Sequence, residues 1–123
     1  MKLNPMLLLA IFPAVASANP YFHSKTGESL VRDFLGPPGH QGELRGQDYL
    51  EHEAARGYID GIKDATQGTG WCYAGRIKPH ELNFELVETI RGLPASARKG
   101  NAAPLVVNAL RAKFPCPARG DQR

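Results

Sequence analysis

Two histidine–glutamate pairs are the residues of this chain whose types and spacing come nearest to catalytic chemistry. His52-Glu53 and His80-Glu81 each begin like the HExxH zinc motif, in which a second histidine one helical turn later completes the ligand pair. Arg56 and Phe84 occupy those later positions, so neither motif is complete. We therefore expect the histidines to be surface polar residues and predict no metal site.

Other acid–base and nucleophilic arrangements are equally incomplete. Asp60 and Asp64 are one helical turn apart, but Lys63 lies beside them, and a solvated charged face explains this trio better than paired catalytic carboxylates. The chain has no GxSxG nucleophile elbow. We therefore predict that the protein is not an enzyme and that it needs no cofactor.

Cys72 and Cys116 are the only cysteines of the chain. An even number of cysteines in a small exported domain predicts a disulfide, and two cysteines allow only one pairing. Free thiols are the alternative, and a cysteine nucleophile would require one of them.

Residues 1–18 have the order of a secretory signal peptide. Lys2 gives a basic start, an apolar run follows from Met6 to Phe12, and Ala16-Ser17-Ala18 is a small-residue cleavage site. The run is too short to cross a bilayer, which takes roughly 20 apolar residues. We predict cleavage after Ala18, export to the periplasm, and one helical domain over residues 19–123.

Charge gives little support for a polyanionic partner. The chain has 15 Lys and Arg residues against 12 Asp and Glu residues, a formal net charge of +3. The two signs are interleaved and form no basic stripe, so we expect no nucleic acid partner. We also expect no membrane partner, because no later stretch is long and apolar enough to span a bilayer.

Helical spacing of apolar residues predicts an all-α fold of about four helices. Gly and Pro clusters separate the helices, with a Gly/Pro-rich loop over residues 36–46 and a polar loop over residues 95–101. The first expected helix runs from Glu28 to Leu35 with Thr26 as its N-cap, and a long helix runs from an Asp48 cap to before Gly68. A third runs from Pro79 to before Gly92. The last runs from about Ala102 to Lys113 with Asn101 as its N-cap.

The long helix carries a stripe of small and apolar residues, which we expect to be its buried face. The stripe consists of Leu50, Ala54, Gly57, Tyr58, Gly61, Ile62 and Ala65. Glycine costs a helix about 1 kcal/mol relative to alanine. Gly57 and Gly61 therefore predict that another backbone packs closely on this face, with the charged residues on the opposite side.

The disulfide then constrains the topology. Cys72 follows the long helix and Cys116 follows the last helix, so the bond would hold two helix C-termini together. We expect an antiparallel third helix between them, in a small orthogonal or up-down bundle pinned by one disulfide.

The spacing of several short motifs resembles a known family. Gly57-Tyr58-Ile59-Asp60-Gly61-Ile62-Lys63-Asp64-Ala65 is followed by Gly68, by Trp71-Cys72, and after a further helix by Ala109-Leu110-Arg111-Ala112-Lys113-Phe114-Pro115-Cys116. This order is similar to the Rap/Tai family of immunity proteins against type VI secretion amidase effectors. The likeness covers about sixty residues from Ala55 to Cys116.

The resemblance implies a periplasmic protein that plugs the active site of a peptidoglycan amidase, with a protruding loop entering the enzyme's cleft. It also implies a possible homodimer. Family members often carry a further cysteine pair that joins the first helix to the second, whereas this chain has Asp33 and Arg56 in those regions. That departure leaves the packing of the first helix open.

Effector contacts are expected from exposed loops rather than from the motif residues. We predict two contact regions, because aromatic and arginine residues are the usual interface anchors. They are the polar loop with Ser96, Arg98, Lys99 and Asn101, and a second patch with Trp71, Tyr73 and Arg76. A plain solvated turn is the alternative for the loop, and a buried cover over the disulfide is the favoured alternative for Trp71.

Three other functions remain open. A periplasmic acid-stress chaperone could share this architecture, but it would need apolar surface that is released at low pH. An inhibitor of another cell-wall hydrolase, such as a lysozyme, would use the same logic against a different target. An enzyme of unknown type would need a cleft with perturbed groups, and no residues nominate one.

Overall fold

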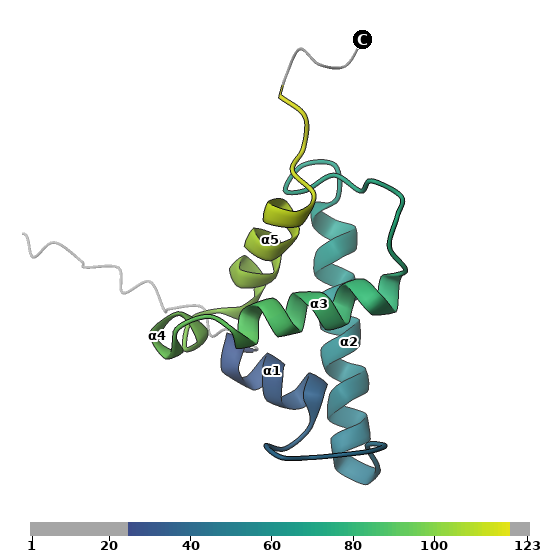
Figure 1. Cartoon of the computed structure of the whole chain (residues 1–123), viewed down its shortest axis with the longest axis vertical. Coiled ribbons are helices and arrows are strands. Elements are labelled where there is room, and N and C mark those ends of the chain that lie inside the picture. The colour runs from purple at the N-terminus through teal and green to yellow at the C-terminus, as the bar shows by residue number, and fades with distance from the viewer. Residues whose placement is uncertain (1–24, 119–123) are drawn as a thin grey trace, which may run out of the picture.

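The structure, a computed structural model, describes residues 25–118, and in this part of the chain every regular element is a helix (Figure 1). The all-α prediction is therefore confirmed, whereas the predicted signal peptide over residues 1–18 lies outside the described residues. The helices are α1 (Gly27–Leu35), α2 (Gly46–Thr66), α3 (Pro79–Arg91), α4 (Ala95–Arg98) and α5 (Ala102–Lys113).

Local capping explains where α1 and α5 begin. The Thr26 hydroxyl accepts a hydrogen bond from the Ser29 backbone N–H at 3.1 Å, and the Ser29 hydroxyl accepts one from the Thr26 N–H at 3.0 Å. This reciprocal capping box satisfies two N–H groups that the helix itself cannot. The Asn101 side chain accepts a hydrogen bond from Ala103 N–H at 3.3 Å. Both predicted N-caps are confirmed.

The start of α2 differs from the prediction. The helix begins at Gly46, its N-cap is Arg45, and no side chain caps it. The expected Asp48 cap is wrong: Asp48 lies inside the first turn, where a negative charge is favourable next to the positive end of the helix dipole.

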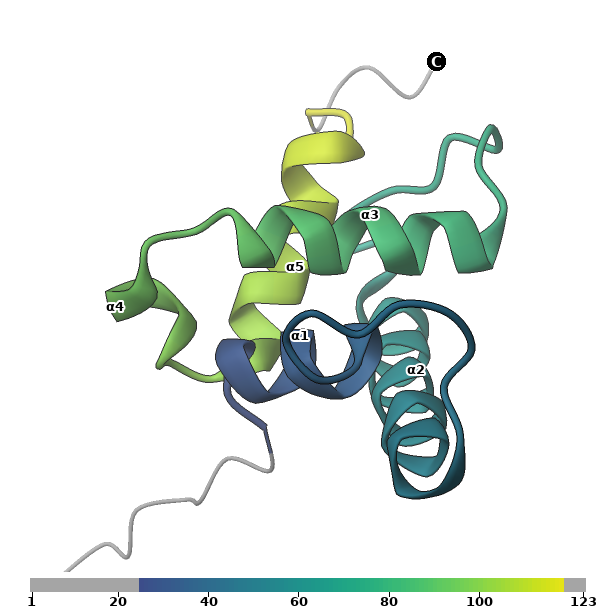
Figure 2. The same ribbon diagram turned by 60° about the horizontal axis from the view of Figure 1, so that its bottom comes forward.

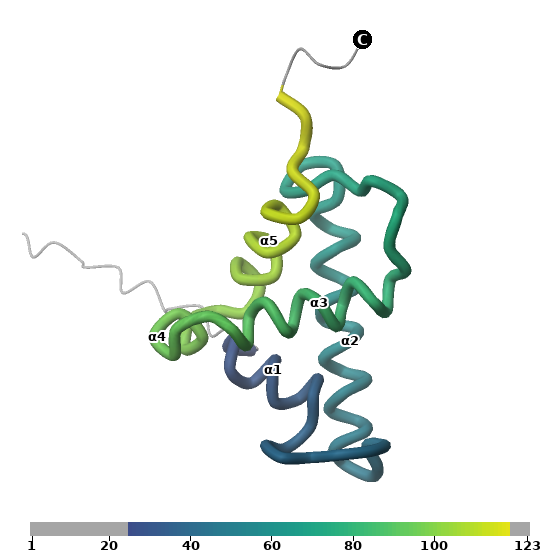
Figure 3. Tube along the Cα trace, viewed as in Figure 1, coloured from purple at the N-terminus to yellow at the C-terminus, as the bar shows by residue number. Residues whose placement is uncertain are grey.

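Two helices run side by side and a third crosses them. α2 and α5 extend toward the same end of the molecule, while α3 lies across both and α1 packs below it (Figures 1 and 2). The orthogonal form of the predicted bundle is observed, and the antiparallel third helix is wrong. The reason is the connector over residues 67–78, which carries the chain from the end of α2 back to its middle before α3 starts (Figure 3).

The core lies where α1, α2, α3 and α5 meet. Its fully buried large residues are Leu30, Ile59, Leu86, Val87, Ile90, Val106 and Leu110. Burying one such side chain stabilises the fold by about 1.5–3 kcal/mol. The expected apolar face of α3 is confirmed, and Phe84 is 52% exposed on its other side.

The buried face of α2 is not the predicted stripe. The helix buries Ala55, Ile59 and Lys63, whereas Leu50 is 61% exposed. A Cβ atom added at Gly57 or Gly61 would meet nothing within 4 Å, so the close backbone packing expected there is absent from the described chain. The observed buried face is rotated around the helix from the predicted one and shares Tyr58 and Ile62 with it, which are partly buried against the core.

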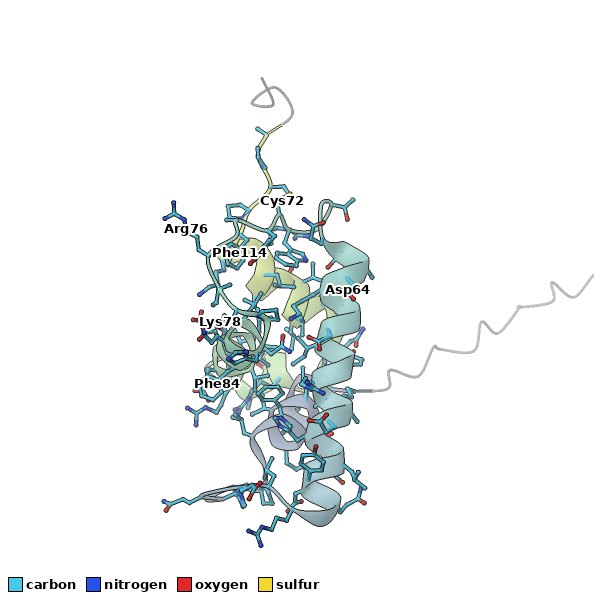
Figure 4. The ribbon with its side chains drawn as sticks, turned by 90° about the vertical axis from the view of Figure 1, so that its right-hand side faces the viewer. Asp64, Cys72, Arg76, Lys78, Phe84 and Phe114 are labelled. Atoms are coloured by element: carbon cyan, nitrogen blue, oxygen red, sulfur yellow. A yellow bond between two sulfur atoms is a disulfide. The ribbon has the colours of Figure 1, made fainter. Side chains whose placement is uncertain are left out.

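The predicted disulfide is present and joins the ends of α2 and α5. Cys72 and Cys116 have Cα atoms 4.7 Å apart, and the Cys72 N–H donates a hydrogen bond to the Phe114 carbonyl at 3.0 Å. Figure 4 shows Cys72 and Phe114 together at this end of the molecule. The crosslink spans 44 residues of sequence, so it restricts the unfolded chain by about 4 kcal/mol in the entropy model.

A chain that carries Cys72→Ser and Cys116→Ser should therefore lose about 2–4 kcal/mol of unfolding free energy, measured by urea denaturation. Reduced wild-type protein is the matched control and should lose a similar amount. Equal stability of the oxidised wild type and the double variant would contradict the proposed contribution.

Candidate functional site

The polar segment around α4 projects from one end of the molecule. α4 is a single helical turn with no buried residue, and Figures 1 and 2 show it outside the body formed by α3 and α5. Sequence reasoning expected a plain loop here and missed this turn. Ser96 and Lys99 are exposed, as expected for contact residues, while Arg98 and Asn101 are half-buried.

Backbone hydrogen bonds fix the α4 segment to the start of α1. The Gly27 N–H donates to the Gly100 carbonyl and the Ala102 N–H donates to the Lys25 carbonyl, each at 3.0 Å. The Arg98 guanidinium donates from Nη1 to the Arg91 carbonyl at 3.1 Å and so ties α4 to the end of α3. The segment is therefore a firmly held projection.

The second predicted patch, Trp71, Tyr73 and Arg76, has one buried residue and two exposed ones. Trp71 is only 4% exposed, and its indole N–H donates to the Lys63 carbonyl at 3.3 Å. Tyr73 packs edge-on against Trp71, with ring centroids 6.4 Å apart, and is 50% exposed. Arg76 is exposed and points away from the connector (Figure 4). Trp71 thus forms a floor next to the disulfide, as its alternative interpretation held, and Tyr73 and Arg76 form the accessible surface.

The structure does not bring the two predicted contact regions together. α4 lies beside the start of α1, whereas the connector over residues 67–78, which carries Tyr73 and Arg76, lies toward the other end of α5 (Figure 1). A partner that touched both would have to cover the length of α5 or α3.

A partly buried ion pair within α2 is linked to α3 by hydrogen bonds. Lys63 is 8% exposed, and its ammonium group lies 2.9 Å from the Asp60 carboxylate. The buried Asn83 amide donates to the same Asp60 oxygen at 2.8 Å. Burial acts to raise the pKa of Asp60, but the hydrogen bonds from Asn83 and Lys63 outweigh it, so this pKa is lowered. Asp60 and Lys63 were expected on a solvated face; Lys63 is buried instead, whereas the Asp60 side chain stays 44% exposed.

A second carboxylate, Asp33 on α1, was missed by sequence reasoning. It is 6% exposed and accepts hydrogen bonds from Lys25 at 2.7 Å and from Arg32 at 2.8 Å. Burial acts to raise the pKa of Asp33, but these two cations lower it further than burial raises it. The helical phase of Asp33, next to Leu30 and Phe34 on one face, was the available signal.

Neither metal-ligand clusters nor membrane spans occur in the described part of the chain. No group of three or more His, Cys, Asp or Glu side chains there could hold a metal ion. No helix within residues 25–118 is long and apolar enough to cross a bilayer.

A small helical scaffold that displays a polar projection and a separate aromatic surface is the architecture of a binding protein. The chain belongs to the Rap1a immunity protein family, whose model matches residues 26–116. This family is non-enzymatic, which confirms the expectation from the incomplete motifs. No curated protein matches the chain.

The Asp33 cluster makes a testable contribution to pH-dependent stability. Because the folded-state pKa of Asp33 is lowered, its contribution is complete above the unfolded value of about 3.9 and is lost as the pH falls through the folded value. Asp33→Asn should cost about 1.5–3 kcal/mol near neutral pH. The difference from wild type should shrink below about pH 4, as followed by urea unfolding.

Glu43→Gln is the matched control, since the Glu43 side chain is 81% exposed, and it should change stability little at any pH. A difference between wild type and Asp33→Asn that stays constant down to strongly acidic pH would show that the carboxylate charge does not stabilise the fold.

Proposed function

We propose that this chain is a periplasmic immunity protein that binds a peptidoglycan amidase effector of a type VI secretion system and blocks its active site. The match to the immunity family carries this proposal. It favours immunity over an acid-stress chaperone or an inhibitor of another cell-wall hydrolase, which were the alternatives from sequence.

The projection formed by Ser96, Arg98, Lys99 and Asn101 is the part that we assign to the amidase cleft. Its exposed residues, Ser96 and Lys99, carry no core contact, and the hydrogen bonds at Gly100 and Ala102 hold its base. A rigid projection loses little conformational entropy on binding, which favours affinity. Asn101 acts indirectly, because its side chain caps α5.

Tyr73 and Arg76 form a second contact surface in this proposal, supported from below by Trp71. Both residues are exposed on the connector, and both types are enriched at interface hot spots. The Tyr73 hydroxyl donates to the Ile77 carbonyl at 3.2 Å, so the ring is held in place before any partner arrives.

The periplasm is the compartment that fits the covalent chemistry. The Cys72–Cys116 disulfide forms and persists in an oxidising compartment, and the predicted signal peptide would deliver the chain there after cleavage at Ala18.

The decisive experiment titrates the oxidised domain into the amidase encoded beside it while cleavage of peptidoglycan peptides is followed. We expect stoichiometric inhibition. Lys99→Glu should weaken inhibition about tenfold or more, because a charge reversal inside an interface removes one favourable pair and adds repulsion. Arg45→Glu, at a side chain 86% exposed outside both contact regions, is the control. Full-strength amidase activity in excess wild-type protein would refute the proposal.

Homodimerisation is also part of this proposal, and the exposed stripe of α2 is the surface that we assign to it. Gly57 and Gly61 cost helix stability but face solvent, and the stripe continues into Leu50, which is 61% exposed. A second copy of α2 packed on this stripe would bury Leu50 and use the close approach that glycine permits.

Gly57→Lys tests this surface without disturbing the domain, since a Cβ there meets nothing within 4 Å. Sedimentation equilibrium should show a dimer for wild type and a monomer for the variant, with unchanged helical circular dichroism. Glu81→Lys, on an exposed position of α3, should remain dimeric. A Gly57→Lys protein that dimerises as tightly as wild type would exclude this face.

A further inference from the structure

A groove of about 600 Å³ lies beside α4 and shares Arg98 with the projection, while its other lining residues belong to neither contact region described above. α1 supplies Val31 and Leu35 and the following loop supplies Pro37 and Pro38, which together form an apolar wall. Arg91 from the end of α3 and Arg98 from α4 form a second, cationic wall. Figure 2 shows α1 and the loop after it below α3, with α4 at the side.

The side chains that line the groove carry an excess of positive charge. Its lining includes Arg32, Arg91 and Arg98 against the single carboxylate of Glu28. Arg32 is paired with Asp33, and Arg91 is paired with Glu88 on its own helix. Arg98 forms no ion pair with any residue of the described chain, so it contributes an uncompensated positive charge to the groove.

Arg98 also has unused hydrogen-bonding capacity. Its Nη1 donates to the Arg91 carbonyl, but its Nε is buried and has no acceptor within residues 25–118. A buried guanidinium N–H without an acceptor is unfavourable, and a carboxylate is the acceptor that matches the planar fork best. A modest rotation of the side chain toward the groove would present the fork to such a group.

The apolar wall restricts what kind of occupant fits. Pro37 and Pro38 have no N–H groups to offer, and with Val31 and Leu35 they present an apolar surface rather than a second set of donors. A small inorganic anion would leave this wall uncovered. A peptide segment with an acidic side chain beside an apolar one would satisfy both walls at once.

We propose that this groove receives an acidic segment of the effector, with a carboxylate held by Arg98 and Arg91 and a neighbouring apolar side chain packed on Val31 and Leu35. This inference rests on the proposed immunity function and names the chemistry of the partner at a surface adjoining the projection. It makes recognition of the effector partly electrostatic, and therefore sensitive to salt.

The test measures the affinity of the intact oxidised protein for a catalytically inactive form of the neighbouring amidase by calorimetry. Arg98→Gln and Arg91→Glu should each weaken binding by about 10- to 100-fold. Arg45→Glu makes the same charge change as Arg91→Glu outside the groove and should change the affinity less than about threefold. Raising the salt from about 50 to about 500 mM should weaken wild type more than Arg98→Gln.

A photo-crosslinking residue in place of Pro38 identifies the occupant directly. A crosslink to an acidic segment of the amidase supports the inference, while a crosslink to a second copy or to this chain's own termini overturns it. Wild-type binding that is unaffected by Arg98→Gln and Arg91→Glu, in properly folded protein, also overturns it and leaves the immunity function intact. Absence of any binding by wild type refutes the immunity function itself.

Discussion

Lys63 is buried where α2, α3 and the connector between them meet, and the arrangement of these three segments depends on the partners of its ammonium group and its carbonyl. Its ammonium group meets the Asp60 carboxylate and lies 3.5 Å from the Pro79 carbonyl at the start of α3, while its own carbonyl accepts the Trp71 indole N–H. One residue thus fixes the origin of α3, the end of α2 and the aromatic floor near the disulfide. Removing Asp60 would leave the ammonium group of Lys63, whose side chain is 10% exposed, without its carboxylate partner, which costs more than losing an ion pair between two exposed side chains.

Signals that act over a few residues could be read from the sequence. The Thr26 and Asn101 caps, the proline that opens α3 and the single possible disulfide were predicted, because each depends on near neighbours or on a count. The crosswise path of α3 could not be predicted, because it depends on a contact between Asp60 and Asn83, 23 residues apart. The buried face of α2 was misassigned because the long apolar stem of Lys63 was counted as polar surface.

The packing of α1, left open by the absent second cysteine pair, is achieved without a covalent bond. The His52 ring lies 4.7 Å from the Phe34 ring, and its Nδ1 is 2.6 Å from the Phe34 carbonyl, an acceptor that requires the ring nitrogen to donate. Asp33, in one of the regions where relatives often have a cysteine, is neutralised by Lys25 and Arg32 and ties the helix to the segment before it. The ring contact and the hydrogen bond hold α1 against α2, and the charge pairing holds α1 to the segment before it. The candidate contact residues, by contrast, were predicted from residue type and loop position, and these signals could not show that the two regions occupy separate ends of the molecule.

The absence of any buried residue in α4 has an evolutionary consequence. Substitutions along this turn alter the outline and charge of the projection while leaving the hydrophobic core untouched, so their thermodynamic penalty is small. A lineage that meets a new effector can therefore change the exposed residues of this segment at little cost in stability, while selection acts on recognition. The same scaffold could diversify into many specificities in the way that antibody loops do on a common framework, without each new specificity needing compensating repair of the fold.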